Sequence, residues 1–182
     1  MLTGDEQRRL LILARLALEA RVHRIAGPPA DGGGALDARR GAFVSIHAGG
    51  ELRGCLGRID TDWPLGRTVA HLGAAVADSD PRFEPVRPAE LPRIGIEISV
   101  LTDESEIQSI DVIEVGRHGV IVEQGSRRGL LLPQVAAEHH WTRQQLVEQT
   151  CRKAGLAPDA WQHGARIFIF EAQIFSESAL PV

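Results

Sequence analysis

The chain has 182 residues, of which 43% are hydrophobic and 24% are charged, and its formal net charge at pH 7 is −4. This composition is typical of a soluble globular protein with one domain, and the acidic balance argues against general nucleic-acid binding, which depends on excess Lys and Arg. The N-terminal residues resemble neither a signal peptide nor a transit peptide, and no apolar run approaches the roughly 20 residues that span a bilayer. We therefore expect a cytoplasmic protein that binds no membrane.

The two cysteines, Cys55 and Cys151, are far apart in the sequence. Without a secretory signal, we expect two free thiols in a reducing compartment. Structural zinc sites need about four ligands, usually supplied by CxxC-type pairs, and iron–sulfur sites need a cysteine cluster. The adjacent pair His139 and His140 gives little support to a metal site, because neighbouring residues on a helix point apart. The sequence therefore predicts no metal and no cofactor.

Helix start signals and apolar spacing indicate the helices. Thr3 and Glu6 form a capping box ahead of a helix over residues 5–26. The Gly- and Pro-rich segment 27–37 is a flexible loop, which we interpret as a surface connection in preference to a mobile lid. The other expected helices are 64–78, a short one that begins at Pro133, and 142–154.

Alternating apolar and polar residues indicate the strands. The expected strands are 42–47, 51–56, 94–101, 118–124, 129–132 and 166–175. Two pairs of these strands are joined by short turns as hairpins, so antiparallel pairing should dominate. Helices are interleaved with these hairpins, and the predicted class is α+β, a mostly antiparallel sheet packed with helices.

Residues 52–57 (LRGCLG) are the first candidate for a functional site. In an extended segment Arg53 and Cys55 lie on one face and the two leucines on the other. The leucines should turn toward the core, which leaves the cysteine on the polar side. Gly54 and Gly57 carry no side chain, so a ligand or another backbone could approach closely.

Cys55 has two interpretations. Arg53 and Arg58 lie near it in the sequence, and a nearby cation lowers the pKa of a thiol, so it could be a nucleophile or a redox thiol. It could equally be a small buried cysteine, because free Cys packs like a small hydrophobic residue. A cysteine nucleophile generally needs a base; His118, at the start of a strand, is the first candidate, and His47 is a second.

Several arginines could gather around one cleft. Guanidinium groups bind carboxylate and phosphate through two parallel hydrogen bonds, so such a group would form an anion pocket. The alternative is that these arginines are scattered on the solvated surface. The residues concerned are Arg53, Arg58, Arg82, Arg127 and Arg128.

The hexapeptide is similar to the LRGCIG signature of the AMMECR domain family. Bacterial and archaeal members of this family are called AmmeMemoRadiSam system protein A. The resemblance continues in order along nearly the whole chain, from about residue 5 to 178. It rests on Asp80–Phe83 (DPRF), Glu97–Leu101 (EISVL), Gly116–Gly119 (GRHG), Gly129–Val135 (GLLLPQV), Trp141, Lys153–Leu156 (KAGL) and Trp161.

This resemblance implies one AMMECR-like domain over residues 1–182, with a larger lobe and a smaller lobe, the smaller one within 105–145. The signature would line a cleft between the lobes. The family's name implies two partners, a Memo-like protein and a radical S-adenosylmethionine enzyme. The positions that match the family motifs, and are therefore site candidates, are Arg53, Cys55, Asp80, Arg82, His118 and Gln134.

Two functions are compatible with these residues. The first is a binding or adaptor module that presents the LRGCLG cleft to its partners without turnover, which we prefer because no complete acid–base set can be assembled. The second is an enzyme in which Cys55 is a nucleophile or redox thiol, His118 is its base, and arginines hold a small anionic substrate.

Overall fold

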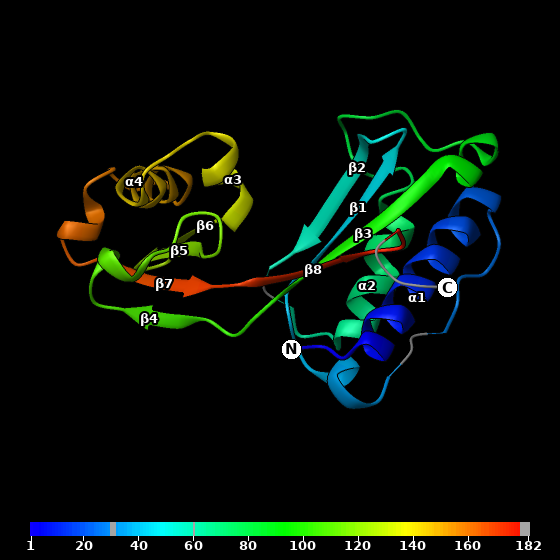
Figure 1. The fold of residues 1–182 in the computed structure, drawn as a ribbon, viewed down its shortest axis with the longest axis horizontal. Helices are drawn as coiled ribbons and strands as arrows, with labels where there is room; N and C mark the ends of the chain where they lie inside the picture. The colour runs from blue at the N-terminus through cyan, green and yellow to red at the C-terminus, as the bar shows by residue number, and fades with distance from the viewer. Residues whose placement is uncertain (30–31, 60, 179–182) are drawn as a thin grey trace. The chain divides into compact units, whose positions relative to one another are not determined.

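The computed structural model describes residues 1–29, 32–59 and 61–178. The chain divides into two compact units (Figure 1). The first comprises Met1–Leu101 together with the C-terminal segment from Gln173, and the second is Thr102–Ala172. The second unit contains the whole 105–145 range in which the resemblance places a smaller lobe, together with the strand of residues 166–170 in its sheet.

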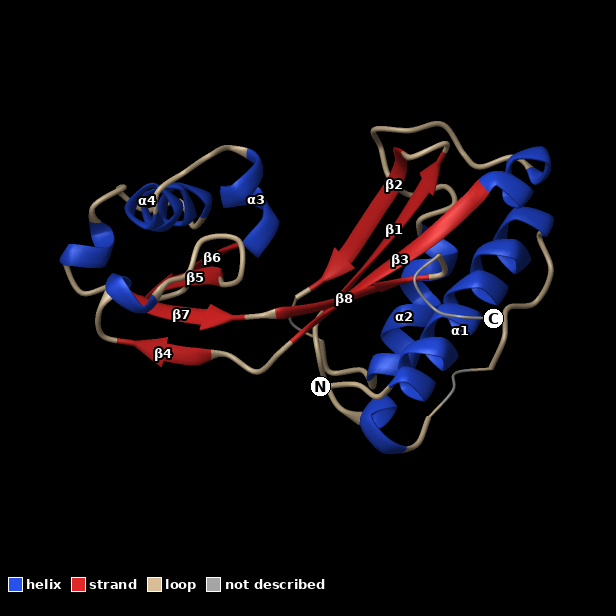
Figure 2. Cartoon of the chain, viewed as in Figure 1, coloured by secondary structure: helices blue, strands red, loops and turns tan. Residues whose placement is uncertain are grey.

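The first unit contains a four-stranded sheet in the order β2-β1-β3-β8, with β1 antiparallel to both β2 and β3. Two helices, α1 and α2, cover one face of this sheet (Figure 2). Its elements are α1 (Gly4–His23), the 3-10 helix η1 (Gly34–Asp37), β1 (Ala42–Ala48), β2 (Glu51–Arg58), α2 (Leu65–Ala75), the 3-10 helix η2 (Pro88–Arg93), β3 (Ile94–Leu101) and β8 (Ala172–Ser176).

Helix α1 begins at the predicted capping box, in which the Thr3 hydroxyl accepts a hydrogen bond from the Glu6 N–H and the Glu6 carboxylate accepts one from the Thr3 N–H. It ends at His23, before the predicted residue 26, because Arg24 adopts a left-handed conformation with φ of 57° and closes the helix. The loop predicted over 27–37 includes a 3-10 turn at its end, and residues 30 and 31 lie outside the described residues.

The second unit contains a sheet in the order β4-β7-β5-β6, in which the three neighbouring pairs are antiparallel. Helix α4 packs on β5 and β6 around a core that includes Val120, Leu146 and Cys151. Its elements are β4 (Ser105–Ile107), the 3-10 helix η3 (Ile110–Val112), β5 (Gly119–Gln124), β6 (Arg127–Leu131), α3 (Pro133–Glu138), α4 (Arg143–Lys153), the 3-10 helix η4 (Ala160–Gln162) and β7 (Arg166–Phe170).

These two mostly antiparallel sheets with their helices confirm the α+β class. The single strand predicted over 166–175 is wrong, because the chain leaves the ladder at Glu171 and forms β7 in one sheet and β8 in the other. At this point the Glu171 N–H donates to Thr102 Oγ1 at 2.8 Å, and the Thr102 N–H donates to the Glu171 carbonyl at 2.8 Å. Strand β4, which is only three residues long, was not predicted.

The face of the first sheet opposite α1 and α2 carries polar side chains. Residues directly opposite one another on paired strands project from the same face. Ser45 of β1 faces Cys55 of β2 on one side and Glu97 of β3 on the other, while its neighbours along β1 are buried in the core. We call the row Ser45, Cys55 and Glu97 the outer row.

Next to the outer row, Phe43 packs over Gly57. The two residues are direct cross-strand partners, and a Cβ atom added to Gly57 would lie 2.1 Å from Phe43 Cδ1. A glycine at this position is therefore required by the aromatic ring, which fills the space that a side chain would otherwise occupy.

We expect Gly57→Ala to lower the free energy of unfolding by about 1–3 kcal/mol, because the Phe43 ring must move to accommodate the methyl group. Gly95→Ala is the matched control, since no atom lies within 4 Å of its added Cβ on the same sheet. Urea denaturation measures both. In a Phe43→Ala background most of the Gly57→Ala loss should disappear, and a loss of unchanged size there would contradict this explanation.

Candidate functional site

Strand β2 does not alternate as its sequence predicts, because it contains a β-bulge at Arg53. Ile46 of β1 faces Gly54, whereas the next residue, His47, faces Leu52, so Arg53 is the extra residue. Leu52 is 42% exposed and does not enter the core, contrary to our expectation, while Leu56 packs against the core in part. A bulge depends on contacts with distant residues, and alternation of the sequence cannot reveal it.

The two glycines of the hexapeptide accommodate neighbouring parts of the protein. A Cβ on Gly54 would lie 3.1 Å from Val76 Cγ2 and 3.2 Å from the Val76 carbonyl oxygen, immediately after helix α2. Gly57 is covered by Phe43. Of the two alternatives that we expected, a ligand or another backbone, Gly54 shows the approach of a backbone group, and Gly57 shows the approach of a side chain.

The backbone N–H and carbonyl of Cys55 are both hydrogen-bonded to side chains of the DPRF loop. β2 is an edge strand, so the N–H and C=O of Cys55 have no strand partner on the outer side. The N–H donates to Asp80 Oδ2 at 2.9 Å, and Arg82 Nη2 donates to the Cys55 carbonyl at 3.4 Å. The DPRF loop thus supplies with two side chains the hydrogen bonds that a neighbouring strand would make. We call this arrangement the Asp80–Arg82 clamp.

Within the clamp the Asp80 carboxylate accepts four hydrogen bonds and is only 4% exposed. Besides the Cys55 N–H, the donors are the Arg82 backbone N–H at 3.1 Å, Arg82 Nε at 3.0 Å and Arg82 Nη2 at 2.8 Å. The hydrogen bonds from the Arg82 side chain lower the pKa of Asp80 well below its usual 3.8, and those from the two backbone N–H groups lower it further against the opposing effect of burial. The hydrogen bond to Asp80 likewise raises the pKa of Arg82.

The thiol of Cys55 is free and half-buried on the outer row. Among the described residues, no side chain forms a hydrogen bond with its sulfur. Two opposite charges of the clamp contact the Cys55 backbone, the Asp80 carboxylate at the N–H and the Arg82 guanidinium at the carbonyl. The geometry therefore fixes the backbone of Cys55 and leaves its thiol without a hydrogen-bond partner among the described residues, with Ser45 as its direct neighbour across the strands and Glu97 beyond Ser45.

The other two predicted arginines of the first unit have different surroundings. Arg53 is 18% exposed at the side chain, and its Nε donates to Glu90 Oε1 at 2.9 Å, while its Nη2 contacts the Pro85 carbonyl at 3.4 Å. It connects the bulge of β2 to η2. Arg58 is exposed and stacks on Trp63, with its Cζ 4.4 Å from the ring centroid.

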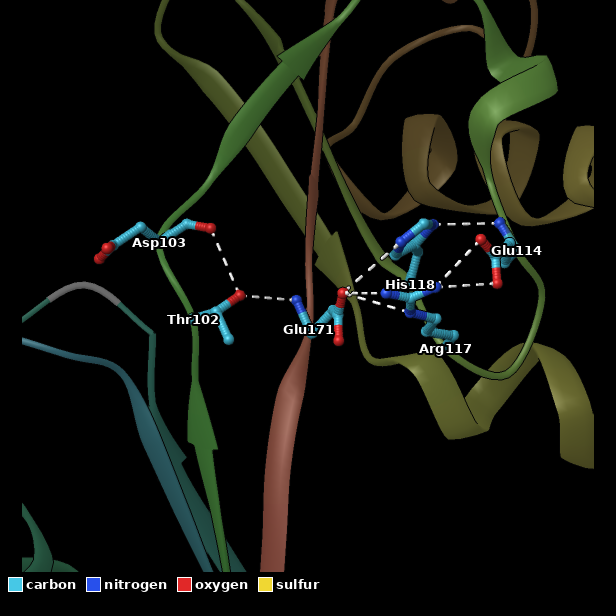
Figure 3. Close-up of polar contacts among 6 residues, drawn as sticks. All are labelled: Thr102, Asp103, Glu114, Arg117, His118 and Glu171. Carbon is cyan, nitrogen blue, oxygen red and sulfur yellow. Dashed lines mark hydrogen bonds and ion pairs between the residues drawn. The ribbon is translucent and has the colours of Figure 1, made fainter. Parts of the chain in front are cut away.

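In the second unit, His118 is buried in a polar cluster with Glu114, Arg117 and Glu171 (Figure 3). Its Nδ1 accepts a hydrogen bond from the Glu114 N–H at 3.1 Å, so the neutral ring carries its proton on Nε2. That nitrogen lies 3.9 Å from Glu171 Oε1. Arg117 also contacts Glu171, with Nη2 3.1 Å from the same oxygen.

Both ring nitrogens of His118 have a neighbouring group within the second unit. One ring nitrogen is occupied by a backbone donor and the other faces a carboxylate that also accepts from Arg117. A general base needs an acceptor nitrogen directed at the proton that it removes. The GRHG motif pointed to His118, but the partners Glu114 and Glu171 gave no signal in the sequence.

The remaining site candidates of the second unit are Arg127, Arg128 and Gln134. The contacts found for the two arginines involve residues outside the His118 cluster. Arg128 forms ion pairs with Glu104 and Glu123, and Arg127 Nη1 donates to the Gly155 carbonyl at 2.9 Å. Gln134, on α3, has a buried Oε1 that accepts no hydrogen bond from the described residues. These contacts do not bring Arg127 or Arg128 together with His118.

The described part of the chain lacks two further features. No group of three or more His, Cys, Asp or Glu side chains there is arranged to hold a metal ion. None of the helices found in this part of the chain has the length and apolar character required to cross a membrane.

Comparison with known proteins gives one consistent result. A family model described as AMMECR1 matches residues 11–175. A protein of Thermofilum pendens is 40% identical over 97% of this chain and 92% of its own length, and one of Methanothermobacter thermautotrophicus is 41% identical over 97% and 96%. The crystal structure of an uncharacterised protein from Pyrococcus horikoshii matches with a TM-score of 0.78 and 36% identity, over 94% of this chain and 91% of that one.

We expect Asp80→Asn to lower the free energy of unfolding by about 1–3 kcal/mol at pH 6, because a buried carboxylate with four donors is replaced by a neutral amide. Because the folded-state pKa of Asp80 is lowered, its stabilisation is complete above the usual value of 3.8 and is lost as the pH falls below it. Denaturation in urea at pH 6, 4 and 2.5 should therefore show a smaller acid-induced loss in the variant than in the wild type.

The matched control is Glu106→Gln, which removes an exposed ion pair with Arg166 and should change stability little. If Asp80→Asn behaves like this exposed control at pH 6, the clamp does not stabilise the fold.

Proposed function

Because this chain belongs to the AMMECR1 family, we propose that it is a cytoplasmic binding module that presents its outer row, Ser45, Cys55 and Glu97, to a partner protein. The observation that carries the proposal is the Asp80–Arg82 clamp. It fixes the backbone of Cys55 at the edge of the sheet while the thiol remains half-buried on the face opposite the helices.

A fixed surface of this kind suits recognition. Binding is stronger when a surface is already in its bound conformation, since less conformational entropy is lost on association. The strand that carries Cys55 is held by the clamp on its outer edge and by β1 on its inner edge. Small and polar side chains on the outer row also leave space for a partner's side chains.

We propose as partners a Memo-like protein and a radical S-adenosylmethionine enzyme, which the family's system name associates with this domain. The residues that support docking without turnover are those around the thiol. Among the described residues no base is hydrogen-bonded to the Cys55 sulfur, and Nδ1 of His118 already accepts the Glu114 N–H.

An enzymatic function of Cys55 is the alternative, and one observation favours it. The Arg82 guanidinium lies against the Cys55 carbonyl, and the thiol is not sealed in the core. Arg82 could hold a small anionic substrate near the sulfur if its ion pair with Asp80 leaves donors available, since a guanidinium has five N–H groups.

Three substitutions, two at Cys55 and one at Glu97, separate these functions. Cys55→Ala removes the sulfur and keeps the surface small, so a binding module should retain its affinity for the purified partners. Cys55→Arg and Glu97→Arg place a large charged group in the outer row and should each weaken binding at least about tenfold. Biolayer interferometry with each partner measures these affinities.

Glu19→Arg is the matched control, because Glu19 lies on α1, which covers the other face of the sheet. Thermal melts verify that each variant is folded. Full affinity in both arginine variants of the outer row would refute docking at this surface. Rapid alkylation of Cys55 by iodoacetamide in the free protein, together with lost turnover in Cys55→Ala on a defined substrate, would instead support the enzyme.

A further inference from the structure

We propose that a cavity between β2 and η2 is a binding site for a small dianion, either a phosphate group or a pair of carboxylates. The cavity has a volume of about 570 Å³, which is within the roughly 300–1,000 Å³ range of small-molecule pockets. It lies entirely within the first unit. Its charged lining comes from Arg53, Arg87, Arg93, Glu84 and Glu90.

Two of these arginines are available to a ligand. Among the described residues, the side chains of Arg87 and Arg93 form no hydrogen bond and no direct ion pair, and both residues are exposed. The positive charge of Arg87 nevertheless acts on Glu90 and contributes to the lowered pKa of that carboxyl group. Two guanidinium groups at one cavity match the charge of a dianion, and each can donate two parallel hydrogen bonds to its oxygen atoms.

The third arginine forms the wall of the cavity. Arg53 is tied to Glu90 through Nε and Nη2, so the two charges compensate each other and Glu90 repels an incoming anion less. The second carboxylate oxygen of Glu90 accepts the Arg87 N–H at 2.8 Å, which holds the backbone of Arg87 at the rim. The pKa of Glu90 is lowered mainly by its hydrogen bond with Arg53, in agreement with this pairing.

The uncharged lining limits the ligand to a compact molecule. Ala48, Pro85 and Ala89 supply short apolar surfaces next to the arginines. A ligand with one anionic head group and a short carbon chain would contact both kinds of surface. Glu84 is exposed to solvent, as Arg87 and Arg93 are, so the charges of all three are screened; the three arginines of the lining outnumber its two carboxylates.

This site is independent of the proposed docking surface, since none of its lining residues belongs to the outer row. Its test uses the purified chain without any partner, so a failure here leaves the docking proposal unaffected. Isothermal titration calorimetry with inorganic phosphate and with succinate, at constant ionic strength set by NaCl, measures binding of the two dianions.

We expect saturable binding of at least one dianion with a Kd of about 1 mM or lower. Arg87→Ala and Arg93→Ala should each weaken it about tenfold or more, as expected for the loss of a charge-assisted hydrogen bond. Arg39→Ala is the matched control, because Arg39 is an exposed arginine of the same unit outside the cavity, and it should leave the Kd unchanged.

Arg87→Lys adds a test of geometry, since lysine keeps the charge but lacks the planar fork. Binding of phosphate alone would assign a phosphate ligand, and binding of succinate alone would assign a dicarboxylate; both outcomes support the site. The proposal is overturned if neither dianion gives saturable heat, or if the Arg87→Ala/Arg93→Ala double variant binds as well as the wild type.

Discussion

The first unit depends on a hydrogen-bonded ion pair at the edge of its sheet. An edge strand exposes unpaired backbone groups, and proteins commonly cover them with loops or charged side chains. Here Asp80 and Arg82 serve both exposed groups of Cys55, one as acceptor and the other as donor. Because the carboxylate is buried and bound by four donors, the loop after α2 and the strand are held in a single arrangement.

Strand β2 is also held by a second ion pair, which involves the residue two positions before Cys55. Arg53 occupies the bulge and donates to Glu90 on η2. Arg53 and Cys55 are thus each fixed by a segment that follows α2, the former through its side chain and the latter through its backbone. Neither pair engages the side chain of Cys55 on the outer row, and this contrast is why we propose the outer row as the docking surface.

Local rules predicted the regular elements well. The capping box of α1, the alternation of β1 and β3, and the first hairpin all appear where side-chain spacing and turn residues indicated. The family resemblance, which rests on several ordered motifs, is confirmed by the family model and by the related structure. The resemblance marked Cys55 and Asp80 as site candidates, and the structure shows that they lie beside each other.

Features set by distant contacts could not be predicted from local patterns. The bulge at Arg53 depends on Glu90, and the end of β7 depends on the exchange of hydrogen bonds between Glu171 and Thr102. Gly57 illustrates the same limit, because a glycine in a strand indicates a close approach without identifying the approaching group. Only the strand register places Phe43 above it.

The order of the two units along the chain has a consequence for biosynthesis. The first sheet takes its fourth strand, β8, from residues 172–176, after the whole second unit has been translated. Until then β3 lacks its outer neighbour and the core lacks Phe175. The nascent first unit therefore has an unpaired edge on β3 while the second unit is being translated. Since β7 of the second sheet precedes β8 by only one residue, the strands that complete the two sheets are synthesised almost together.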